Sequence, residues 1–600
     1  MKPRAVLPFL PYAVFLLLVA VSWNRWIEPF VDTGRELMVP ARVANGEALY
    51  RDVRFYYGPL APYLAAGVDL AAGRSFAARI ALAALVALFH LEALRRLARR
   101  LLPEGLAALT ASVAVGVTFF LRPGGCHLFP YSLDTSLAVT GATGAVVLSA
   151  SGGSVRRDRV AALCLLAALL ARPEIGIAAI GALAAERLLA SDVAAKRRLA
   201  VVAVVPLFAA ALIYALVSVK TPTAILAKEG WLTFLFLPPE FRSVYSSFAG
   251  VDRPALRGAE LGLALIALLL VGAWLLLAAL ASARARRSTP AAGRAIEVFA
   301  VAALGAAALL RLRPPAALVE TAALLPPLVR AIPPLLFAVA VTGAVRRLTD
   351  RTRATALTGV ADSVLLLALF FAGRLFLAAG YVGPYNGFYL PLPLLLAVAL
   401  LLRAAARIPG RIDVSPRPSA FPGLVAASLV VFLGARLIAL ALLYRHPSWS
   451  RVTTPAGSLF VPEPVAGATR GALADLARRV PAGGAIAGFP ETGFFNWVLD
   501  RKNPLAQDQF FPGHLDEAAE AEAIERLREN PPDAIAFVNV RTVGHGRIAL
   551  GKDYLVRLDR FVRESFPRVA AFGPGARPDA RVGDPDFFIE VRAPVEKGRP

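Results

Sequence analysis

Cysteine and histidine are scarce in this sequence, and their scarcity excludes several kinds of site. Only two cysteines, Cys126 and Cys164, occur among 600 residues, so a disulfide framework and a four-cysteine zinc site are both excluded. The five histidines are not paired at the spacing of metal ligands, which argues against a histidine-based metal site. We therefore predict no cofactor and no metal site, although the sequence does not exclude a divalent metal ion.

Charged residues are also scarce within the long apolar runs, although the chain carries a net charge of +23. Hydrophobic residues make up 57% of the chain, and runs such as Leu261–Leu280 and Leu424–Leu443 are long enough to cross a bilayer core of about 30 Å. Arginine and lysine gather instead in short loops between these runs. Binding to nucleic acid would need one continuous basic face, so this distribution excludes a nucleic-acid partner.

About 13 apolar segments are expected to cross the membrane as helices. Basic residues follow the second segment and then every second one, which is the positive-inside pattern and places those loops in the cytoplasm. The amino terminus is then cytoplasmic, and the last part of the chain lies on the opposite side. The segments are residues 5–23, 77–94, 104–121, 131–150, 159–171, 174–190, 199–219, 259–282, 295–310, 323–344, 355–373, 387–403 and 420–443.

Two stretches of this helical part have alternative interpretations. Ala20-Val21-Ser22 resembles a signal-peptidase site, but a long multispan chain follows directly, so we favour an uncleaved first helix. Residues 159–190 could form one long helix, but both flanks are rich in arginine. A hairpin that breaks at Arg172-Pro173-Glu174 keeps both flanks on the cytoplasmic side, and proline supplies the break. Residues 311–344 contain three proline pairs and cannot be placed well.

The last part of the chain has the composition of an ordinary globular domain. Its strands are predicted at residues 485–489, 534–540 and 587–591, and its helices at 516–529 and 554–565. Strands that alternate with helices predict a small α/β domain, and it contains no glycine-rich phosphate loop. The expected fold is a multispan α-helical membrane domain with a long first outside loop, followed by a soluble extracytoplasmic α/β domain. These parts are residues 1–444, 24–76 and 445–600.

A carboxylate and a cation stand close together in the first outside loop. Asp32 follows the first apolar segment by about nine residues, and Arg35 and Glu36 follow it at the spacing of one helical face. Such a carboxylate can take a proton from an acceptor hydroxyl while the cation stabilises an anionic leaving group. The alternative is a solvated cluster of ion pairs that stabilises the loop.

Four stretches of this loop are similar to a known family. They are Asp32-Thr-Gly-Arg-Glu-Leu37, Pro40, Gly46-Glu-Ala-Leu-Tyr-Arg-Asp52 and Tyr57-Gly-Pro-Leu60. They resemble the first periplasmic loop of GT-C glycosyltransferases, including the protein-mannosyltransferase-like and lipid A aminoarabinose-transferase-like proteins of glycosyltransferase family 39. The resemblance implies a many-helix GT-C-like fold and a sugar donor on polyprenyl phosphate. It also implies Asp32 as the catalytic base, with Glu36 as a second catalytic carboxylate.

The chain departs from the family pattern at two places. Many relatives carry a second acidic residue where this chain has Thr33, and Glu36 could take its place. Aminoarabinose-type relatives carry Lys-Pro-Pro-Leu where this chain has Tyr57-Gly-Pro-Leu60, and that lysine binds the lipid phosphate. Its role must therefore pass to another cation. The candidates for binding the donor phosphate are Arg35, Arg54, Arg172 and Lys228.

Other polar side chains are candidates for binding the sugar or the acceptor. Asp134 opens the fourth apolar segment, so it could equally be a charge that the helix dipole favours. Arg172 and Glu174 could be an ion pair that caps two short helices, although charges at a membrane break are costly and usually functional. Residues 488–496 follow a predicted strand, where α/β domains usually bind ligands. The sugar or acceptor candidates are Tyr56, Tyr57, His127, Tyr131, Asp134 and Glu174.

These features together predict an inverting glycosyltransferase of the bacterial plasma membrane. It would move a sugar from a polyprenyl phosphate to a lipid, glycan or protein acceptor on the extracytoplasmic face. A transporter or flippase for a lipid-linked glycan is the main alternative, and a non-catalytic assembly protein is the second. Transport is disfavoured because ion-coupled transporters need ionisable residues near the middle of their helices, and these are scarce here.

Overall fold

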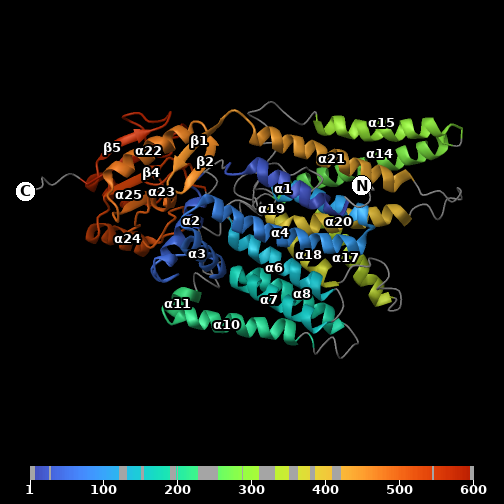
Figure 1. Ribbon diagram of the computed structural model, residues 1–600, viewed down its shortest axis with the longest axis horizontal. Helices are drawn as coiled ribbons and strands as arrows, with labels where there is room; N and C mark the ends of the chain where they lie inside the picture. The colour runs from blue at the N-terminus through green and yellow to red at the C-terminus, as the bar shows by residue number, and fades with distance from the viewer. Residues whose placement is uncertain are drawn as a thin grey trace, which may run out of the picture.

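The computed structural model consists mostly of helices, with a small sheet domain at the carboxyl-terminal end (Figure 1). Large parts of the first outside loop lie between these two regions. The described residues are 7–25, 29–120, 132–150, 154–189, 198, 200–227, 254–286, 288–309, 331–349, 362–378, 386–407, 420–542 and 546–594.

Long helices form an elongated body that meets the sheet domain at one end (Figure 1). Each of the predicted apolar segments overlaps one of these helices. They are α1 (Leu10–Ser22), α4 (Phe76–Leu101), α5 (Glu104–Thr118), α6 (Leu133–Ser149), α7 (Val155–Ala171), α8 (Pro173–Leu189), α10 (Val205–Ser218), α14 (Pro254–Ala285), α15 (Pro290–Leu309), α17 (Ile332–Thr349), α18 (Asp362–Ala378), α20 (Pro391–Arg407) and α21 (Ala420–Tyr444). Shorter turns are η2 (Leu7–Phe9), η3 (Ala200–Val204), α11 (Thr223–Leu226) and α19 (Asn386–Tyr389).

The helical body has the surface and the helix lengths of a multi-pass membrane protein. Among the described residues, four helical stretches are long and apolar enough to cross a membrane, namely α4, Val201–Ser218, Leu261–Ala285 and Gly423–Tyr444. Several other apolar helices are shorter. Large apolar side chains cover the outside of α14, where Leu263 and Leu269 are 67% and 70% exposed. Lipid makes such exposure favourable. The count of 13 spans and the orientation stay predictions.

The predicted break within residues 159–190 is confirmed. α7 ends at Ala171, Arg172 is extended, and α8 begins at Pro173. Proline is compatible with the first position of a helix because that position needs no N–H donor. α6 lies close along α7 because Gly141 has no side chain, and an added Cβ there would lie 2.4 Å from the carbonyl oxygen of Cys164.

The first outside loop contains two helices, α2 (Thr33–Ala44) and α3 (Leu60–Ala72). Residues 61–72 are apolar but too short to cross a membrane, so the sequence predicts a helix that lies at the interface, and α3 covers these residues. α2 is not a solvated helix, since every residue from Thr33 to Arg42 is buried. It lies between the helical body and the sheet domain (Figure 1), and it packs on α23 (Gly493–Leu499) of that domain. The loop is therefore the connection between the two regions.

The sheet domain contains a hairpin and a four-stranded mixed sheet. Strands β1 (Trp449–Thr454) and β2 (Gly457–Pro462) pair antiparallel. The larger sheet has the order β3-β4-β6-β5, in which β3 and β4 are parallel and the other neighbours are antiparallel. Its elements are β3 (Ile486–Phe489), β4 (Ala534–Val538), β5 (Arg568–Phe572) and β6 (Ile589–Arg592), with helices α22 (Val465–Arg479), α23, α24 (Glu517–Glu529) and α25 (Val556–Ser565).

The sequence predicts β3, β4, β6, α24 and α25 of this domain, and all five are present. β4 is buried at all five of its positions, which explains its continuous apolar sequence. The hairpin, α22, α23 and β5 are not predicted. β5 alternates only weakly between apolar and polar residues, so its pattern carries little signal.

Aromatic rings and a close backbone approach join the start of α2 to the sheet domain. Phe30 is fully buried, and its ring centroid lies 5.7 Å from that of Phe494 and 5.3 Å from that of Phe495. Gly34 faces Gly493, and a Cβ added to Gly34 would lie 3.0 Å from the Gly493 nitrogen. The two backbones can approach this closely because neither residue has a side chain.

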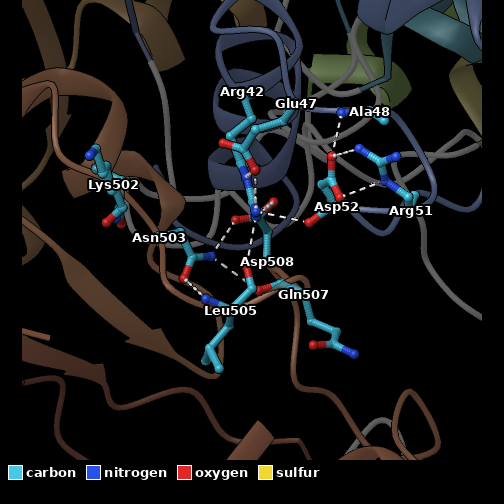
Figure 2. Close-up of polar contacts among 11 residues, drawn as sticks. Arg42, Glu47, Ala48, Arg51, Asp52, Lys502, Asn503, Leu505, Gln507 and Asp508 are labelled. Carbon is cyan, nitrogen blue, oxygen red and sulfur yellow. Dashed lines mark hydrogen bonds and ion pairs between the residues drawn. The ribbon is translucent and has the colours of Figure 1, made fainter. Parts of the chain in front are cut away.

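A buried arginine makes a second connection (Figure 2). Arg42 of α2 donates through Nη1 to the Leu505 carbonyl at 2.8 Å and lies 3.6 Å from Asp508 Oδ2. Its Nη2 donates to Glu47 Oε2 at 2.7 Å and to the Asp52 carbonyl at 3.0 Å. A buried guanidinium is tolerated only with this number of partners. Arg42 therefore ties the first outside loop to the sheet domain.

Replacing Gly58 with alanine should push the first outside loop away from the break between α7 and α8. The Gly58 N–H donates to the Ala171 carbonyl at 3.0 Å. A Cβ at this position would lie 2.1 Å from the Leu170 carbonyl oxygen, a backbone atom that cannot turn aside. We expect Gly58→Ala to lower the free energy of unfolding by about 1–3 kcal/mol, measured as a lower thermal midpoint of the protein in detergent.

Gly67→Ala is the matched control, because a Cβ added there meets nothing within 4 Å. Alanine also favours a helix such as α3 over glycine by about 1 kcal/mol. Equal losses in the two variants would contradict this account of Gly58.

Candidate functional site

Asp32 stands at the start of α2, directly against the sheet domain. Its φ is +61°, which is uncommon for a residue other than glycine. The Asp32 N–H donates to Glu491 Oε2 at 2.8 Å, and the Arg35 N–H donates to Glu491 Oε1 at 3.0 Å. The first N–H groups of a helix have no partner within the helix. Glu491 supplies acceptors for two such groups from another part of the chain.

Gln509 connects the same residues through its side-chain amide. Its Nε2 donates to Asp32 Oδ1 at 2.9 Å and to Glu491 Oε2 at 2.8 Å. Its Oε1 accepts from Arg35 Nη1 at 2.7 Å. One amide thus holds the candidate base and the candidate cation in a fixed relation. The sequence singles out the loop that contains Glu491, but it carries no signal for Gln509.

Arg35 and Glu36 are both buried beside Asp32. Arg35 Nη2 lies 3.7 Å from Asp32 Oδ1 and 3.5 Å from Glu36 Oε1. Burial, followed by the charges of Asp134 and Asp32, raises the pKa of Glu36 to about 8, while Arg35 and the Leu133 N–H act in the opposite direction. Glu36 therefore keeps its proton through much of the neutral range. The alternative of a solvated ion-pair cluster does not fit this degree of burial.

A second buried ion pair lies at the break between α7 and α8. Arg172 Nε donates to Asp134 Oδ2 at 2.6 Å, and Arg172 Nη1 lies 3.5 Å from Glu174 Oε1. The Asp134 side chain is fully buried at the start of α6, where Ser132 also donates to it. Asp134 is thus both a first-turn charge and the partner of Arg172. Three predicted candidates, namely Asp134, Arg172 and Glu174, meet here.

Tyr57 joins the two groups of charges. The guanidinium carbon of Arg172 lies 3.9 Å from the centroid of the Tyr57 ring, and that of Arg35 lies 5.3 Å from it. Both distances are within the range of a cation–π interaction. The Tyr57 carbonyl accepts from the Tyr50 hydroxyl at 2.6 Å, which fixes the loop. The structure thus brings seven predicted site residues together, namely Asp32, Arg35, Glu36, Tyr57, Asp134, Arg172 and Glu174.

The other predicted site residues lie elsewhere. Tyr56 faces the sheet domain, where its ring centroid is 5.2 Å from that of His514. Arg54 donates through its N–H to the Ala506 carbonyl at 2.9 Å, and its Nη1 lies 3.5 Å from the Tyr50 carbonyl. His127, Tyr131 and Lys228 lie outside the described residues, so their roles stay predictions.

Arg374 of α18 is a further cation that the sequence analysis does not single out. Its guanidinium carbon lies 5.4 Å from the centroid of the Tyr389 ring. Arg374 is close enough to Arg172 and Glu174 to interact with both electrostatically. A single arginine within an otherwise apolar helix is the signal that could have identified it.

A small pocket, partly open to solvent, lies beside this cluster. Most of its walls come from α2, α3 and α4, and Arg35, Glu36 and Arg79 supply its charged side chains. Its other lining residues are largely apolar, among them Phe55 and Leu133. A ligand with an anionic group and an apolar part would match such a lining. Within the described ranges, no three acidic, histidine or cysteine side chains are grouped so as to hold a metal ion.

No known protein family and no curated protein matches this sequence. Solved structures do resemble the chain. The oligosaccharyltransferase of Archaeoglobus fulgidus, in complex with zinc and sulfate, is 12% identical with a TM-score of 0.47, over 95% of this chain and 72% of its own. ArnT from Cupriavidus metallidurans, bound to undecaprenyl phosphate, is 15% identical with a TM-score of 0.44, over 98% of this chain and 99% of its own.

Both similar proteins are GT-C glycosyltransferases, the group whose first outside loop this sequence resembles. The archaeal enzyme AglB is also matched in complex with an inhibitory peptide and a dolichol-phosphate, at 13% identity and a TM-score of 0.47, over 98% of this chain and 74% of its own. The likeness is distant in every case. We therefore argue function from the residues of this chain.

The raised pKa of Glu36 should make the stability of the protein depend on pH. The folded protein holds a proton that the unfolded chain releases near pH 4.5, so this contribution is complete below about pH 4.5 and is lost as pH rises through about 8. We expect the thermal midpoint to fall between these two pH values, and to fall less in Glu36→Gln. The measurement is thermal unfolding of both proteins across that range. Parallel curves would show that Glu36 titrates normally.

The Arg172–Asp134 pair should show strong coupling between its two members. Neutralising either one, by Asp134→Asn or Arg172→Gln, leaves a buried charge without its partner, at a cost of about 3–5 kcal/mol. The double variant removes both charges, so we expect it to be more stable than either single variant. Thermal midpoints of the four proteins in detergent complete the cycle. Simple addition of the two losses would mean that the charges do not interact.

Proposed function

We propose that this protein is a glycosyltransferase that moves a sugar from a polyprenyl phosphate to an acceptor hydroxyl or amine on the extracytoplasmic face. One observation carries the proposal. A carboxylate, two buried guanidinium groups and a tyrosine ring form a single cluster, in which Arg35 and Arg172 both contact the Tyr57 ring and Arg35 lies beside Asp32. Base and cation are the two groups that transfer from a phosphate leaving group requires.

Asp32 is the group best suited to act as the base. Its side chain is 22% exposed, more than that of Glu36, so an acceptor can approach it. Glu36 keeps its proton up to about pH 8, because burial and neighbouring carboxylates raise its pKa. It is therefore the weaker candidate for removing a proton at neutral pH. Attack by the acceptor from the side opposite to the phosphate would invert the anomeric centre.

Arg35 is the cation that we favour for binding the donor phosphate. The charge of Arg172 is already balanced by the fully buried Asp134 carboxylate at 2.6 Å. Arg35 instead donates to a neutral amide at 2.7 Å, and its neighbour Glu36 is protonated near neutral pH. Arg35 also lies 3.7 Å from Asp32 Oδ1 and in the wall of the pocket, so a phosphate bound there would lie beside the base. Arg172 then acts mainly by holding the Tyr57 ring at the break between α7 and α8.

The small pocket beside the cluster is where we place the phosphate end of the donor. Arg35 and Glu36 lie in its wall with Phe55 and Leu133, so an anionic group and an apolar segment can be bound together. Tyr57 is our candidate for contacting the sugar, because its ring contacts both cations. Tyr56 faces His514 of the sheet domain and is the weaker candidate for that role. The isoprenoid tail would extend between the apolar helices of the body.

The test is mass spectrometry of polyprenyl-phosphate sugars in cells that lack this protein. One glycolipid should accumulate in these cells and disappear when the wild-type chain is restored. Asp32→Asn keeps the size of the side chain but removes the proton acceptor, so we expect it to leave the glycolipid uncleared. Arg35→Gln should clear it slowly, by about 10²–10³-fold, which is the usual cost of losing one group that stabilises developing charge.

Asp52→Asn is the control, because it makes the same chemical change on the same loop. The Asp52 carboxylate pairs with the exposed Arg51 at 2.9 Å, and such surface pairs contribute little. It should clear the glycolipid as well as the wild type. Clearance by Asp32→Asn at the wild-type rate would exclude Asp32 as the base and favour transport or assembly instead.

A further inference from the structure

Two side chains of the sheet domain lie in the cluster, and the proposed mechanism does not use them. Glu491 follows β3, and Gln509 lies on the chain that leads from α23 toward α24. Glu491 is fully buried and Gln509 is 3% exposed. Both contact the candidate base and the candidate cation, as described above. A buried polar group on a domain boundary needs a reason, because burial without partners is costly.

The amide of Gln509 suits its surroundings better than other side chains would. Its oxygen accepts from Arg35, while its nitrogen donates to Asp32 and to Glu491. A side-chain amide has two N–H donors and a carbonyl acceptor, so every hydrogen atom is used. A carboxylate in its place would face two other carboxylates. An apolar side chain of the same shape would remove one hydrogen bond from each of Arg35, Asp32 and Glu491.

Glu491 takes over the task of capping α2. The Asp32 side chain makes no hydrogen bond to the first turn of its helix. Glu491 accepts from the Asp32 and Arg35 N–H groups at 2.8 and 3.0 Å instead. The Asp32 carboxylate is therefore not used for capping, and it accepts a hydrogen bond from Gln509 instead. It also holds the Asp32 backbone in its left-handed conformation, which is costly without such support.

We propose that Glu491 and Gln509 are positioning residues of the transferase site, so that the site of the membrane domain is complete only when the sheet domain is docked on α2. The proposal rests on the proposed function. Gln509 fixes the distance between the base and the phosphate-binding cation, and Glu491 fixes the backbone that carries both. Neither residue needs to touch the substrate.

The charges around Asp32 give this proposal a distinctive signature. Arg35 and Glu36 face Asp32 from α2, and Glu491 and Gln509 face it from the sheet domain. Burial and the Asp32 charge raise the pKa of Glu491 above its ordinary range, which keeps the negative charge beside Asp32 small. A new carboxylate at position 509 would add negative charge next to the base. Asp32 would then be harder to ionise, and activity would be lost at the acid end of its pH range.

The experiment uses the full chain in lipid nanodiscs. Membranes from cells lacking the protein supply both the accumulated glycolipid and the acceptor, and the rate of glycolipid loss is followed. We expect Gln509→Met, which has the same shape and no amide, to lower kcat by about 10²-fold with little change in KM. Gln509→Glu should also lose activity, and the acid limb of its pH profile should move to higher pH. Gln507→Met is the matched control, because Gln507 is also a buried glutamine and lies two residues from Gln509. Its side chain points away from Arg42 (Figure 2).

The outcomes separate this proposal from the proposed function. Wild-type activity in both Gln509 variants, with Asp32→Asn inactive, would overturn the positioning role alone. Activity in Asp32→Asn would overturn the proposed function. Equal losses in Gln507→Met and Gln509→Met would indicate a purely structural role for this loop and would also reject the proposal. Hydrogen exchange of residues 30–38 provides a test that does not depend on activity. Glu491→Ala should speed exchange at the start of α2, whereas Glu517→Ala, at an exposed position of α24, should not.

Discussion

The arrangement of the candidate site depends on how the first turn of α2 is capped. A helix begins with N–H groups that need acceptors, and here a carboxylate from a segment more than 450 residues away supplies them, since Asp32 and Glu491 are 459 positions apart. The acceptor belongs to the sheet domain. The N–H groups at the start of α2 therefore gain their hydrogen-bond partner only when the sheet domain is docked on the helix. Gly34 and Gly493 permit the close approach, and the buried Phe30 ring fills the space beside it.

Electrostatics explains why so many ionisable groups can be buried at this junction. Each guanidinium has a carboxylate or an amide within reach, and Tyr57 offers a ring face to two of them. Glu36 remains protonated near neutral pH, which limits the repulsion between carboxylates. Arg172 and Asp134 form the closest ion pair of this cluster, at 2.6 Å, whereas Arg35 lies farther from Asp32 and Glu36, at 3.7 and 3.5 Å. The cluster therefore contains the buried Arg172–Asp134 pair beside Asp32 and Arg35, the groups that we propose as base and phosphate-binding cation.

The position of the cluster also suits chemistry on a lipid-linked substrate. It lies where the first outside loop meets the ends of α6, α7 and α8 on one side and the sheet domain on the other. An apolar chain would remain among the helices while its phosphate reaches Arg35. The acceptor would approach Asp32 from the sheet domain, which also supplies the groups that orient it. In the proposed mechanism, the membrane helices and the sheet domain therefore contribute different halves of one site.

The sequence by itself determined the features that depend on neighbours along the chain. Long apolar runs gave the helices, Pro173 gave the break after α7, and the spacing of Asp32, Arg35 and Glu36 placed them on one turn. Only the tertiary structure decided which distant groups meet them. Arg172 and Asp134 are 38 positions apart, and Gln509 and Asp32 are 477 apart. The local periodicity of the sequence does not reveal such contacts. They arise only when separate elements pack together and the sheet domain docks on α2.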